Sequence, residues 1–457
     1  MYRRHRTPLF LLISFLLLLG CADPVADAAP VACEPGLVES IDMDRTMGHL
    51  HVLVDEIGPR VASSHAEREA AEYIARELES YGYEVEIQEF PRDQVVSRIE
   101  VVDPADLRIY PATGRIEDTP AAEYFQLTGE EGITADVVDC GEGACPAEAE
   151  GAIALFAQGE SDAGDLLAHA ADVGAVAAIL HGNDWRRHLT SVEPDDAVLP
   201  FVTVNVEAGD ALREAGGVRV TLHVEFFDTS QNVIATRRVE GDPDAPVVVF
   251  SAHYDSVEQA PGASDNASGT SGMMEIARLY ANVETDVELR FAAVGAEEVG
   301  LVGSRYYVSQ LPDHEIDRIV ANFNTDMIGT AGELQTQLFV NTLDGDNVVA
   351  RSARVARDLL ELPEESMRAP FQRGASDHVA FHDAGIPAAN FIWRDPETID
   401  LEPWYHQPHD TSDRISRDRM RTAMSVVLLA SQQVICEAGA FRDEVPGATT
   451  DPTEEME

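Results

Sequence analysis

Apolar positions after residue 63 follow first a helical and then a strand period. Ser64 and Glu67 have the spacing of a capping box, in which two side chains satisfy free amides at a helix start. Apolar residues then recur three and four positions apart: Ala70, Ala71, Ile74, Leu78 and Tyr81. Gly82 is suited to end this helix, and residues 83–87 alternate between apolar and polar, which predicts a strand. The pair is one helix–strand unit of an α/β domain.

A continuous apolar run, Val247–Ala252, predicts a different kind of strand. Such a run is typical of a strand that is buried on both faces of a mostly parallel sheet. Gln231–Val239 predicts a further strand, and helical and apolar patterns alternate from there to about Ala440. We therefore expect an α/β fold with a mostly parallel, mixed central sheet flanked by helices.

The stretch from Asp93 to Asp228 differs from the rest of the chain in its sequence patterns. It contains the cysteine pair of DCGEGACP, the strand-like AEGAIALFAQG, an alanine-rich segment at 162–182 that predicts a helix, and a strand at 218–227. This arrangement resembles a protease-associated domain, a smaller α/β insert found in several secreted peptidases. It carries no obvious chemistry of its own.

The N-terminus has the layout of an export signal. Three arginines precede an apolar run, Leu9–Leu19, that is short for a membrane span. The run ends in Leu-Leu-Gly-Cys, which resembles a lipobox and makes Cys21 the candidate lipidation site; an ordinary signal peptide with an incidental cysteine is the alternative. Ala22 after this cysteine is similar to the pattern that directs lipoproteins to an outer membrane. We expect a cell-envelope lipoprotein or a secreted protein that meets the membrane only through this lipid.

The predicted organisation follows from these segments. It runs as a signal peptide at 1–20, a lipid-anchored tether at 21–40, the first part of the main domain at 41–92, the insert at 93–228, the main part at 229–440 and an acidic disordered tail at 441–457.

The cysteines left after lipidation are even in number, as suits an oxidising compartment. Cys140 and Cys145 are candidates to close a tight loop, and Cys33 and Cys436 to link the two ends of the folded part. Other pairings stay open.

Composition excludes several classes of function. Acidic residues number 82 against 32 basic ones, for a formal net charge of −50, and such a surface repels nucleic acids. The charge fits either ordinary solubility or adaptation to high salt. The chain has no lysine, which excludes Schiff-base, pyridoxal-phosphate and P-loop chemistry.

Side chains suited to metal chemistry follow predicted strands of the main domain, where open α/β sheets place their ligands. The segments are FSAHYDSV with His253 and Asp255, PGASDNASG with Asp265, AAVGAEEVGLVGS with Glu297 and Glu298, IVANFNTDMIG with Asp326, and PWYHQPHDT with His406. Each segment alone is weak evidence for a metal site. Together they supply histidine and carboxylate ligands of the kind that zinc prefers, and one additional glutamate beside them.

The order HxD, SDNASG, AEEVGLVGS, NTDMIG and YHxPxDT resembles the M28 family of co-catalytic zinc peptidases, over roughly residues 40–440. The resemblance implies a zinc-exopeptidase fold, peptide substrates and two zinc ions per chain. It places His253 and Asp326 on one zinc ion, Glu298 and His406 on the other, and Asp265 between them.

The resemblance also assigns roles around these ligands. Glu297 becomes the general base, Tyr405 a donor to the oxyanion, and Asn266 the second residue of a strained peptide bond. Asp255 is expected to hold the ring of His253. His409 competes with His406, but the family spacing to Asp410 favours His406; His378 is expected near the site without being a ligand, and His382 is expected to be structural.

Several functions stay open at this point. An aminopeptidase is favoured, with no obligate protein partner. A carboxypeptidase or dipeptidase of the same scaffold would need Arg373 or Arg394 in its pocket to bind a terminal carboxylate. A glutaminyl cyclase uses one zinc ion and is disfavoured by the full ligand set, and a non-catalytic relic by the presence of every ligand and the base.

Overall fold

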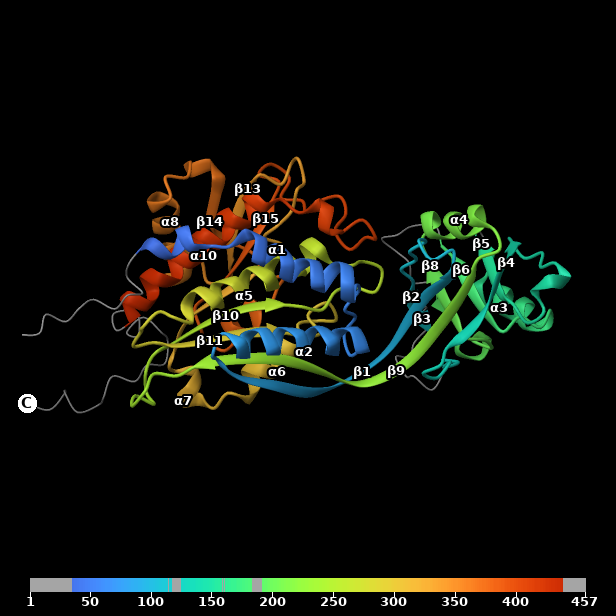
Figure 1. Cartoon of the computed structure of the whole chain (residues 1–457), viewed down its shortest axis with the longest axis horizontal. Helices are drawn as coiled ribbons and strands as arrows, with labels where there is room; N and C mark the ends of the chain where they lie inside the picture. Colours follow the sequence, from blue (N-terminus) through green and yellow to red (C-terminus); the bar gives the residue numbers. More distant parts are fainter. Residues whose placement is uncertain are drawn as a thin grey trace, which may run out of the picture.

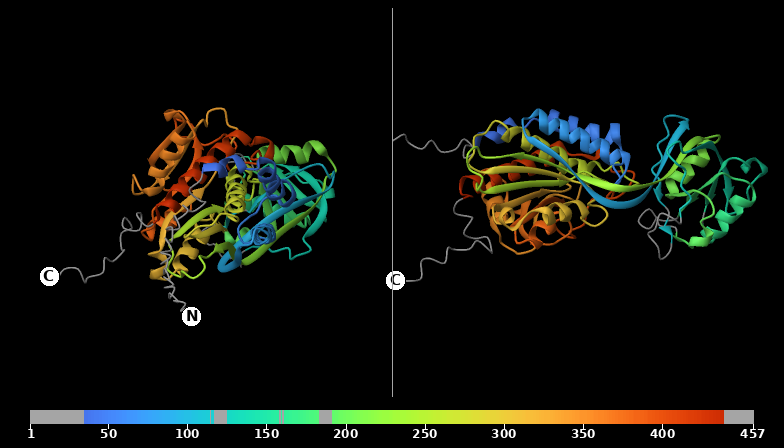
Figure 2. Two further views of the ribbon diagram at one scale, coloured as in Figure 1. Left: turned by 60° about the vertical axis from the view of Figure 1, so that its left-hand side comes forward. Right: turned by 90° about the horizontal axis from the view of Figure 1, so that it is seen from below.

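The computed structural model describes residues 35–113, 115–116, 125–157, 159, 161–182 and 191–438. They form two lobes joined by a pair of long strands (Figures 1 and 2). Strands β1 (Glu84–Asp103) and β9 (Arg219–Arg237) pair antiparallel along most of their length and run from the larger lobe into the smaller one. The sequence patterns at 218–227 and 231–239 therefore belong to one continuous strand. The predicted boundaries of the insert, 92/93 and 228/229, fall inside these two strands and stay a prediction.

The larger lobe is built on a mixed sheet with strand order β14-β13-β15-β12-β10-β11-β9. Strands β10, β11, β12 and β15 are parallel, and β9 runs antiparallel to β11. Strand β13 runs antiparallel to β15 and parallel to β14. The bounds are β10 Val247–His253, β11 Glu288–Val294, β12 Ile319–Thr325, β13 Gln337–Thr342, β14 Met367–Gln372 and β15 Ala388–Arg394. The predicted fold class is confirmed.

Helices cover both faces of this sheet. Helices α1, α2, α5, α8 and α10 pack their apolar sides on one face, and α6 and α9 pack on the other. The bounds are α1 Met43–His51, α2 His65–Ser80, α5 Gly269–Tyr280, α6 Val302–Gln310, α7 Asp313–Ile316, α8 Val348–Leu359, α9 His378–Asp383 and α10 Arg417–Cys436. Helix α2 begins as the sequence predicts, with the Ser64 side chain accepting a hydrogen bond from the amide of Glu67.

A row of phenylalanines aligns the central strands. Phe250 of β10 stands at the same register position as Phe291 of β11 and Phe323 of β12. Their rings stack with centroids 4.8 and 5.6 Å from Phe250, fully buried under the helices. Because these strands are parallel and level, the residues that follow them emerge at one edge of the sheet.

The smaller lobe contains a sheet of β4 (Ile133–Gly141), β5 (Ile153–Ala157), β6 (Ala177–His181), β8 (Phe201–Val204) and β2 (Ala112–Thr113), with helices α3 (Ala163–Asp172) and α4 (Val206–Ala215). The prediction of one helix over 162–182 was wrong in its second half. Gly174, with φ of 79°, follows the helix end, and Ala177–His181 is a buried strand between β5 and β8. A buried apolar run of this length has no period that separates helix from strand.

The three cysteines among the described residues are divided between the two lobes. Cys140 and Cys145 form a disulfide in the smaller lobe. Cys436, at the end of α10, is also disulfide-bonded. Cys21 and Cys33 lie outside the described residues, so lipidation and the pairing of Cys33 with Cys436 stay predictions.

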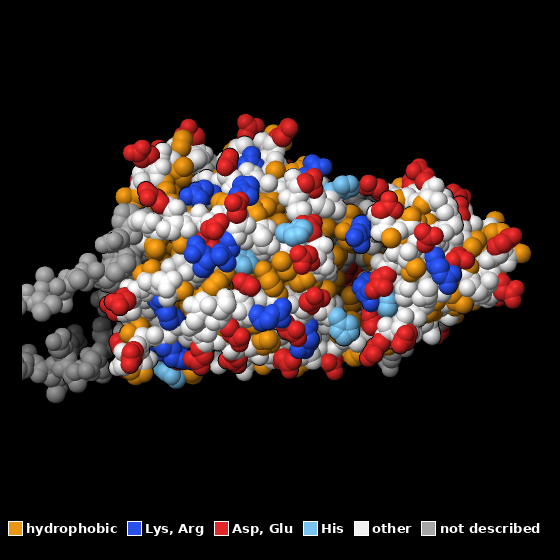
Figure 3. Space-filling model, in the orientation of Figure 1, with side chains coloured by type: hydrophobic (Ala, Val, Ile, Leu, Met, Phe, Trp, Pro, Cys, Tyr) orange, Lys and Arg blue, Asp and Glu red, His pale blue; other side chains and the backbone are white. Residues whose placement is uncertain are grey.

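Acidic side chains are spread over both lobes on the face shown in Figure 3. Within the described part of the chain, no helix has the length and apolar character required to cross a bilayer.

A buried histidine in the larger lobe should make stability depend on pH. The ring nitrogens of His49 lie 2.6 Å from the hydroxyl of Tyr73 and 3.1 Å from that of Tyr81. Burial, with the charge of Arg45 adding to it, lowers the pKa of His49 to about 4. As pH falls from 6.5 toward 4, the unfolded chain binds a proton that the folded chain excludes, so stability falls. Between pH 7 and pH 4, the free energy of unfolding of the wild type should drop by about 3 kcal/mol more than that of His49→Gln. Denaturant titrations at both pH values measure it; an equal pH dependence in the two proteins would contradict it.

Candidate metal centre

The predicted site residues meet at the carboxyl edge of the central strands, at the end of the sheet nearer the smaller lobe (Figure 1). His253 is the last residue of β10, and Asp326 directly follows β12. Glu297 and Glu298 come three and four residues after the end of β11. Asp265 lies in the irregular turn η7 (Ala263–Ser268) that leads into α5, and His406 lies in the loop before α10.

The Asp265 carboxylate stands between two histidines. Its Oδ1 is 3.2 Å from Nε2 of His253, and its Oδ2 is 3.1 Å from Nε2 of His406. A second carboxylate joins each histidine: Asp326 Oδ1 is 3.5 Å from the His253 nitrogen, and Glu298 Oε2 is 3.0 Å from the His406 nitrogen. The centre therefore has two halves, each with a histidine and a carboxylate of its own, and they share Asp265.

The distances also bring Glu297 into this cluster. Ligand atoms of His253, Glu297 and Asp326 lie within 4.8 Å of one another, and so do those of His253, Asp265 and Glu298.

Buried atoms at the centre lack the partners that buried polar groups normally have. Among the described residues, none makes a hydrogen bond to Oδ1 of Asp326, Oε1 of Glu298 or Nε2 of His406, although the His406 nitrogen lies 3.0 and 3.1 Å from two carboxylate oxygens. Leaving such atoms unsatisfied is costly, and a cation among them would remove the cost. Imidazole nitrogens and carboxylate oxygens are the donor set of zinc sites.

The charges of the centre favour a cation in the same way. Burial raises the pKa of Glu298 to about 7, and the neighbouring charge of Asp265 adds to the effect. Burial alone would lower the pKa of His406, but Glu298 and Asp265 raise it to about 11. The cluster therefore attracts positive charge strongly enough to hold a proton on an imidazole, and a divalent ion would replace that proton.

Asp255 supports both sides of the centre. Its Oδ1 lies 3.5 Å from Nδ1 of His253, on the ring edge away from the cluster. The same carboxylate accepts hydrogen bonds from the backbone amides of Glu297 (3.0 Å) and Glu298 (3.2 Å). One buried side chain thus orients a candidate ligand, His253, and holds the turn that carries Glu297 and Glu298.

Two side chains hold the turn that carries Asp265. The Asp410 carboxylate accepts hydrogen bonds from the amides of Ser264 and Asp265, at 2.8 and 3.1 Å. Asn266 donates to the carbonyl of Thr325 at 2.9 Å and accepts the amide of Met327 at 3.1 Å, which ties the turn to the residues flanking Asp326. The peptide bond between Asp265 and Asn266 is cis.

Arg60 is a supporting residue that sequence reasoning missed. Its guanidinium is fully buried and donates only to backbone carbonyls: Leu53, Gly58, Tyr254, Pro261 and Gly262. It holds the chain between β10 and η7 and places a positive charge behind the acidic centre. An arginine in a loop between two helices gives no signal of this role in the sequence.

Tyr405 packs directly on a candidate ligand. Its ring stacks on that of His406 with centroids 3.7 Å apart. Burial raises the pKa of Tyr405 above its usual value, and the charges of Asp265 and Glu298 raise it further. Its hydroxyl therefore stays protonated and able to donate.

The other histidines lie outside the cluster. His378 is buried, and its Nε2 lies 3.0 Å from the carbonyl of Arg373. His409 reaches Glu207 of the smaller lobe at 3.4 Å, so the geometry favours His406 as the candidate ligand. His382 lies on α9 and belongs to neither group of candidate ligands.

Arg394 is one of the two arginines considered for binding a terminal carboxylate. Arg394 is buried at the end of β15 and donates to the carbonyl of Ile399 at 3.0 Å. Burial, with the charge of Arg373 adding to it, lowers the pKa of Arg394 to about 10, and Asp326 and Tyr405 act against the shift.

Comparison with known proteins identifies the family. The model of peptidase family M28 matches residues 232–431, and that of the PA domain matches residues 133–212. The chain is 38% identical over 391 residues to aminopeptidase YwaD of Bacillus subtilis (strain 168), with 84% of this chain and 83% of that protein covered. It is 27% identical over 455 residues to the probable lipoprotein aminopeptidase LpqL of Mycobacterium tuberculosis, with 88% of each covered. The solved structure of a zinc aminopeptidase from Bacillus subtilis superposes with a TM-score of 0.61 at 35% identity, covering 86% of this chain and 95% of that one. The chain belongs to peptidase family M28 and carries a PA domain within it.

Proposed function

We propose that this protein is an exported two-zinc aminopeptidase that removes residues from the N-terminus of peptides. The observation that carries the proposal is the position of Asp265, whose two oxygens each face one histidine–carboxylate half of the centre. Relatives named as aminopeptidases support the choice of activity.

The centre would hold the metal ions with the residues of its two halves. His253 and Asp326 would bind one zinc ion, Glu298 and His406 the other, and Asp265 both. Zinc bound there supplies an acidified water molecule and polarises the scissile carbonyl.

Glu297 is the proposed general base. It is adjacent to a candidate ligand, and its amide is held by Asp255 at 3.0 Å. Burial raises the pKa of Glu297 well above its usual range, and the charge of Asp377 adds to the shift. A carboxylate with a raised pKa takes a proton from water more readily and can then pass it to the leaving amine.

The remaining groups would orient the substrate. Tyr405, protonated and stacked on His406, is the proposed donor to the carbonyl oxygen as negative charge develops there. The excess of carboxylates at the centre suits the protonated amine of a peptide N-terminus.

Export and anchoring form a separate part of the proposal. We infer that residues 1–20 direct secretion and that a lipid on Cys21 anchors the protein in the cell envelope. The relative named as a probable lipoprotein aminopeptidase supports this part.

A panel of reporter substrates tests the activity. We expect the protein from Ala22 onward to cleave aminoacyl-4-nitroanilides with a free amine and to leave N-blocked analogues intact. A chelator should abolish cleavage, and added zinc should restore it. Release of C-terminal residues from N-blocked peptides would instead indicate a carboxypeptidase, with Arg373 and Arg394 as the first residues to replace. Cyclisation of an N-terminal glutamine without hydrolysis would indicate a cyclase, and no turnover by zinc-loaded protein would rule out the aminopeptidase.

A further inference from the structure

The turn that carries Glu297 is held at successive backbone amides by side chains from separate elements. The amide of Gly295 donates to Oδ1 of Asn232 at 3.1 Å, and the amide of Ala296 donates to Oε1 of Glu67 at 3.1 Å. The amide of Glu297 itself donates to Asp255 at 3.0 Å. Asn232 belongs to β9 and Glu67 to α2, so two elements outside the candidate metal centre fix the approach to the proposed base.

Glu67 does more than cap its helix. It is fully buried, and its Oε2 accepts hydrogen bonds from the amide of Ser63 at 2.7 Å and from the side chain of Gln231 at 3.1 Å. Helix capping accounts for the first of these contacts, but not for the contact with Ala296 across the sheet edge. The approach is close, because a Cβ atom on Gly295 would lie 2.5 Å from Glu67 Oε1.

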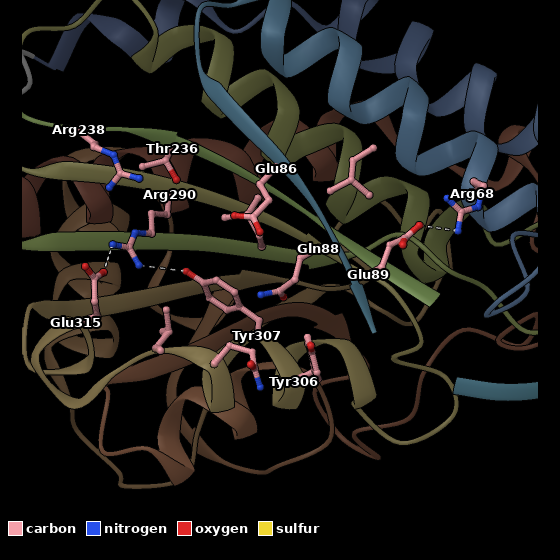
Figure 4. A pocket seen from close by; sticks show the side chains of 14 residues that line it. Arg68, Glu86, Gln88, Glu89, Thr236, Arg238, Arg290, Tyr306, Tyr307 and Glu315 are labelled. Atoms are coloured by element: carbon pink, nitrogen blue, oxygen red, sulfur yellow. Dashed lines mark hydrogen bonds and ion pairs between the residues drawn. The ribbon is translucent and has the colours of Figure 1, made fainter. Parts of the chain in front are cut away.

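Asn232 joins the two ends of the loop that contains Glu297. Besides accepting the amide of Gly295, it donates to the carbonyl of Gly303 at 2.9 Å. Its Nδ2 also reaches Oε1 of Gln88 at 3.0 Å. Gln88 lines a pocket of about 820 Å³ beside β1 (Figure 4), whose lining residues include none of the candidate metal ligands.

The backbone is strained at Ala296, which lies between the two glycines that Asn232 contacts, Gly295 and Gly303. Ala296 has φ of 54°, a left-handed conformation that residues with a Cβ rarely adopt. Such a conformation persists where the surrounding contacts determine it, and it often accompanies function. Here the amides of Gly295, Ala296 and Glu297 are all held by buried side chains, so the direction in which Glu297 leaves the turn is set by those side chains.

We propose that Glu67 and Asn232 are positioning residues for the general base. By accepting hydrogen bonds from the amides of Ala296 and Gly295, they determine where the Glu297 carboxylate stands relative to the metal centre. The inference rests on the proposed function, because it takes Glu297 to be the base.

Steady-state kinetics and zinc content of the Glu67→Gln and Asn232→Ala variants test the inference. An amide at residue 67 has one acceptor oxygen, so its NH₂ group would face the amide of Ala296 or of Ser63. We expect kcat on leucine-4-nitroanilide to fall about 10- to 100-fold in each variant, the loss that a small misplacement of a catalytic group produces. KM should change less than about twofold, and bound zinc should stay at the wild-type level, because the candidate ligands are untouched.

Matched controls separate positioning from stability. Ser64→Ala removes the N-cap of the same helix, and Gln88→Ala removes the contact of Asn232 on the pocket side. Both should lower the melting temperature without lowering kcat. An unchanged kcat in Glu67→Gln and Asn232→Ala, or a loss of zinc that accounts for their lower activity, would overturn the inference.

Combination with Glu297→Gln tests the route of the effect. If Glu67 acts through the base, adding Glu67→Gln to Glu297→Gln should cause no further loss of kcat. The same 10- to 100-fold loss in both backgrounds would overturn the positioning role. Wild-type kcat in Glu297→Gln alone would show that the base assignment itself fails, which is a separate result from failure of the positioning role.

Discussion

Glu297→Gln should lower kcat by about 10²- to 10⁴-fold, the usual contribution of a positioned general base. The substitution keeps the shape of the side chain and the amide contact with Asp255, and removes only the ability to take a proton. Because Glu297 is the additional carboxylate beside the proposed ligands, the variant should bind the same amount of zinc as the wild type. Metal analysis and kinetics on leucine-4-nitroanilide measure both quantities.

The adjacent residue supplies the matched control. Glu298→Gln makes the same chemical change one position away, at a carboxylate 3.0 Å from His406. It should lose zinc as well as activity, and excess zinc should restore part of its activity. If both variants lose zinc equally, or if Glu297→Gln retains wild-type kcat, the separation of base from ligand is wrong.

The sequence predicted that the site residues would meet, because a simple rule connects the position of a residue after a buried strand with its place in the fold. Residues that follow parallel buried strands must emerge at one edge, and the apolar runs before His253, Glu297 and Asp326 mark three such strands. The assignment of a role to each residue needed the family resemblance. Spacing alone does not separate Glu297 from Glu298, or His406 from His409.

The parts that the sequence did not predict depend on contacts between distant segments. Polar Asp228, Thr229 and Ser230 separate the two predicted strands, yet they lie within continuous β9, where Ser230 is buried and donates to Glu67. Glu67 shows its capping spacing in the sequence, but its contact with Ala296 spans 229 positions. Arg60 donates to backbone carbonyls, which every residue has, so no pattern of side chains in the sequence predicts its supporting role.

Asp265→Asn should have a larger effect on metal binding than any other single substitution at the centre. The carboxylate presents one oxygen to each half, at 3.2 Å from His253 and 3.1 Å from His406. Asparagine is almost the same size but offers one oxygen, no charge, and an NH₂ group that would face the other half. Both zinc ions should therefore bind more weakly, by more than the roughly 10- to 100-fold that losing an outer partner of a metal ligand costs.

Asp326→Asn makes the comparison that distinguishes a shared ligand from an ordinary one. Of the two candidate histidine ligands, Asp326 pairs with His253 and not with His406, so its replacement should weaken one zinc ion and leave the second in place. Zinc titrations of metal-free protein, followed by activity on leucine-4-nitroanilide, resolve the two patterns. Equal loss of one ion in both variants would mean that Asp265 serves a single metal. Two ions bound with unchanged affinity in Asp265→Asn would mean that this carboxylate does not bridge, because a bridging ligand that becomes neutral must weaken both of the ions it joins.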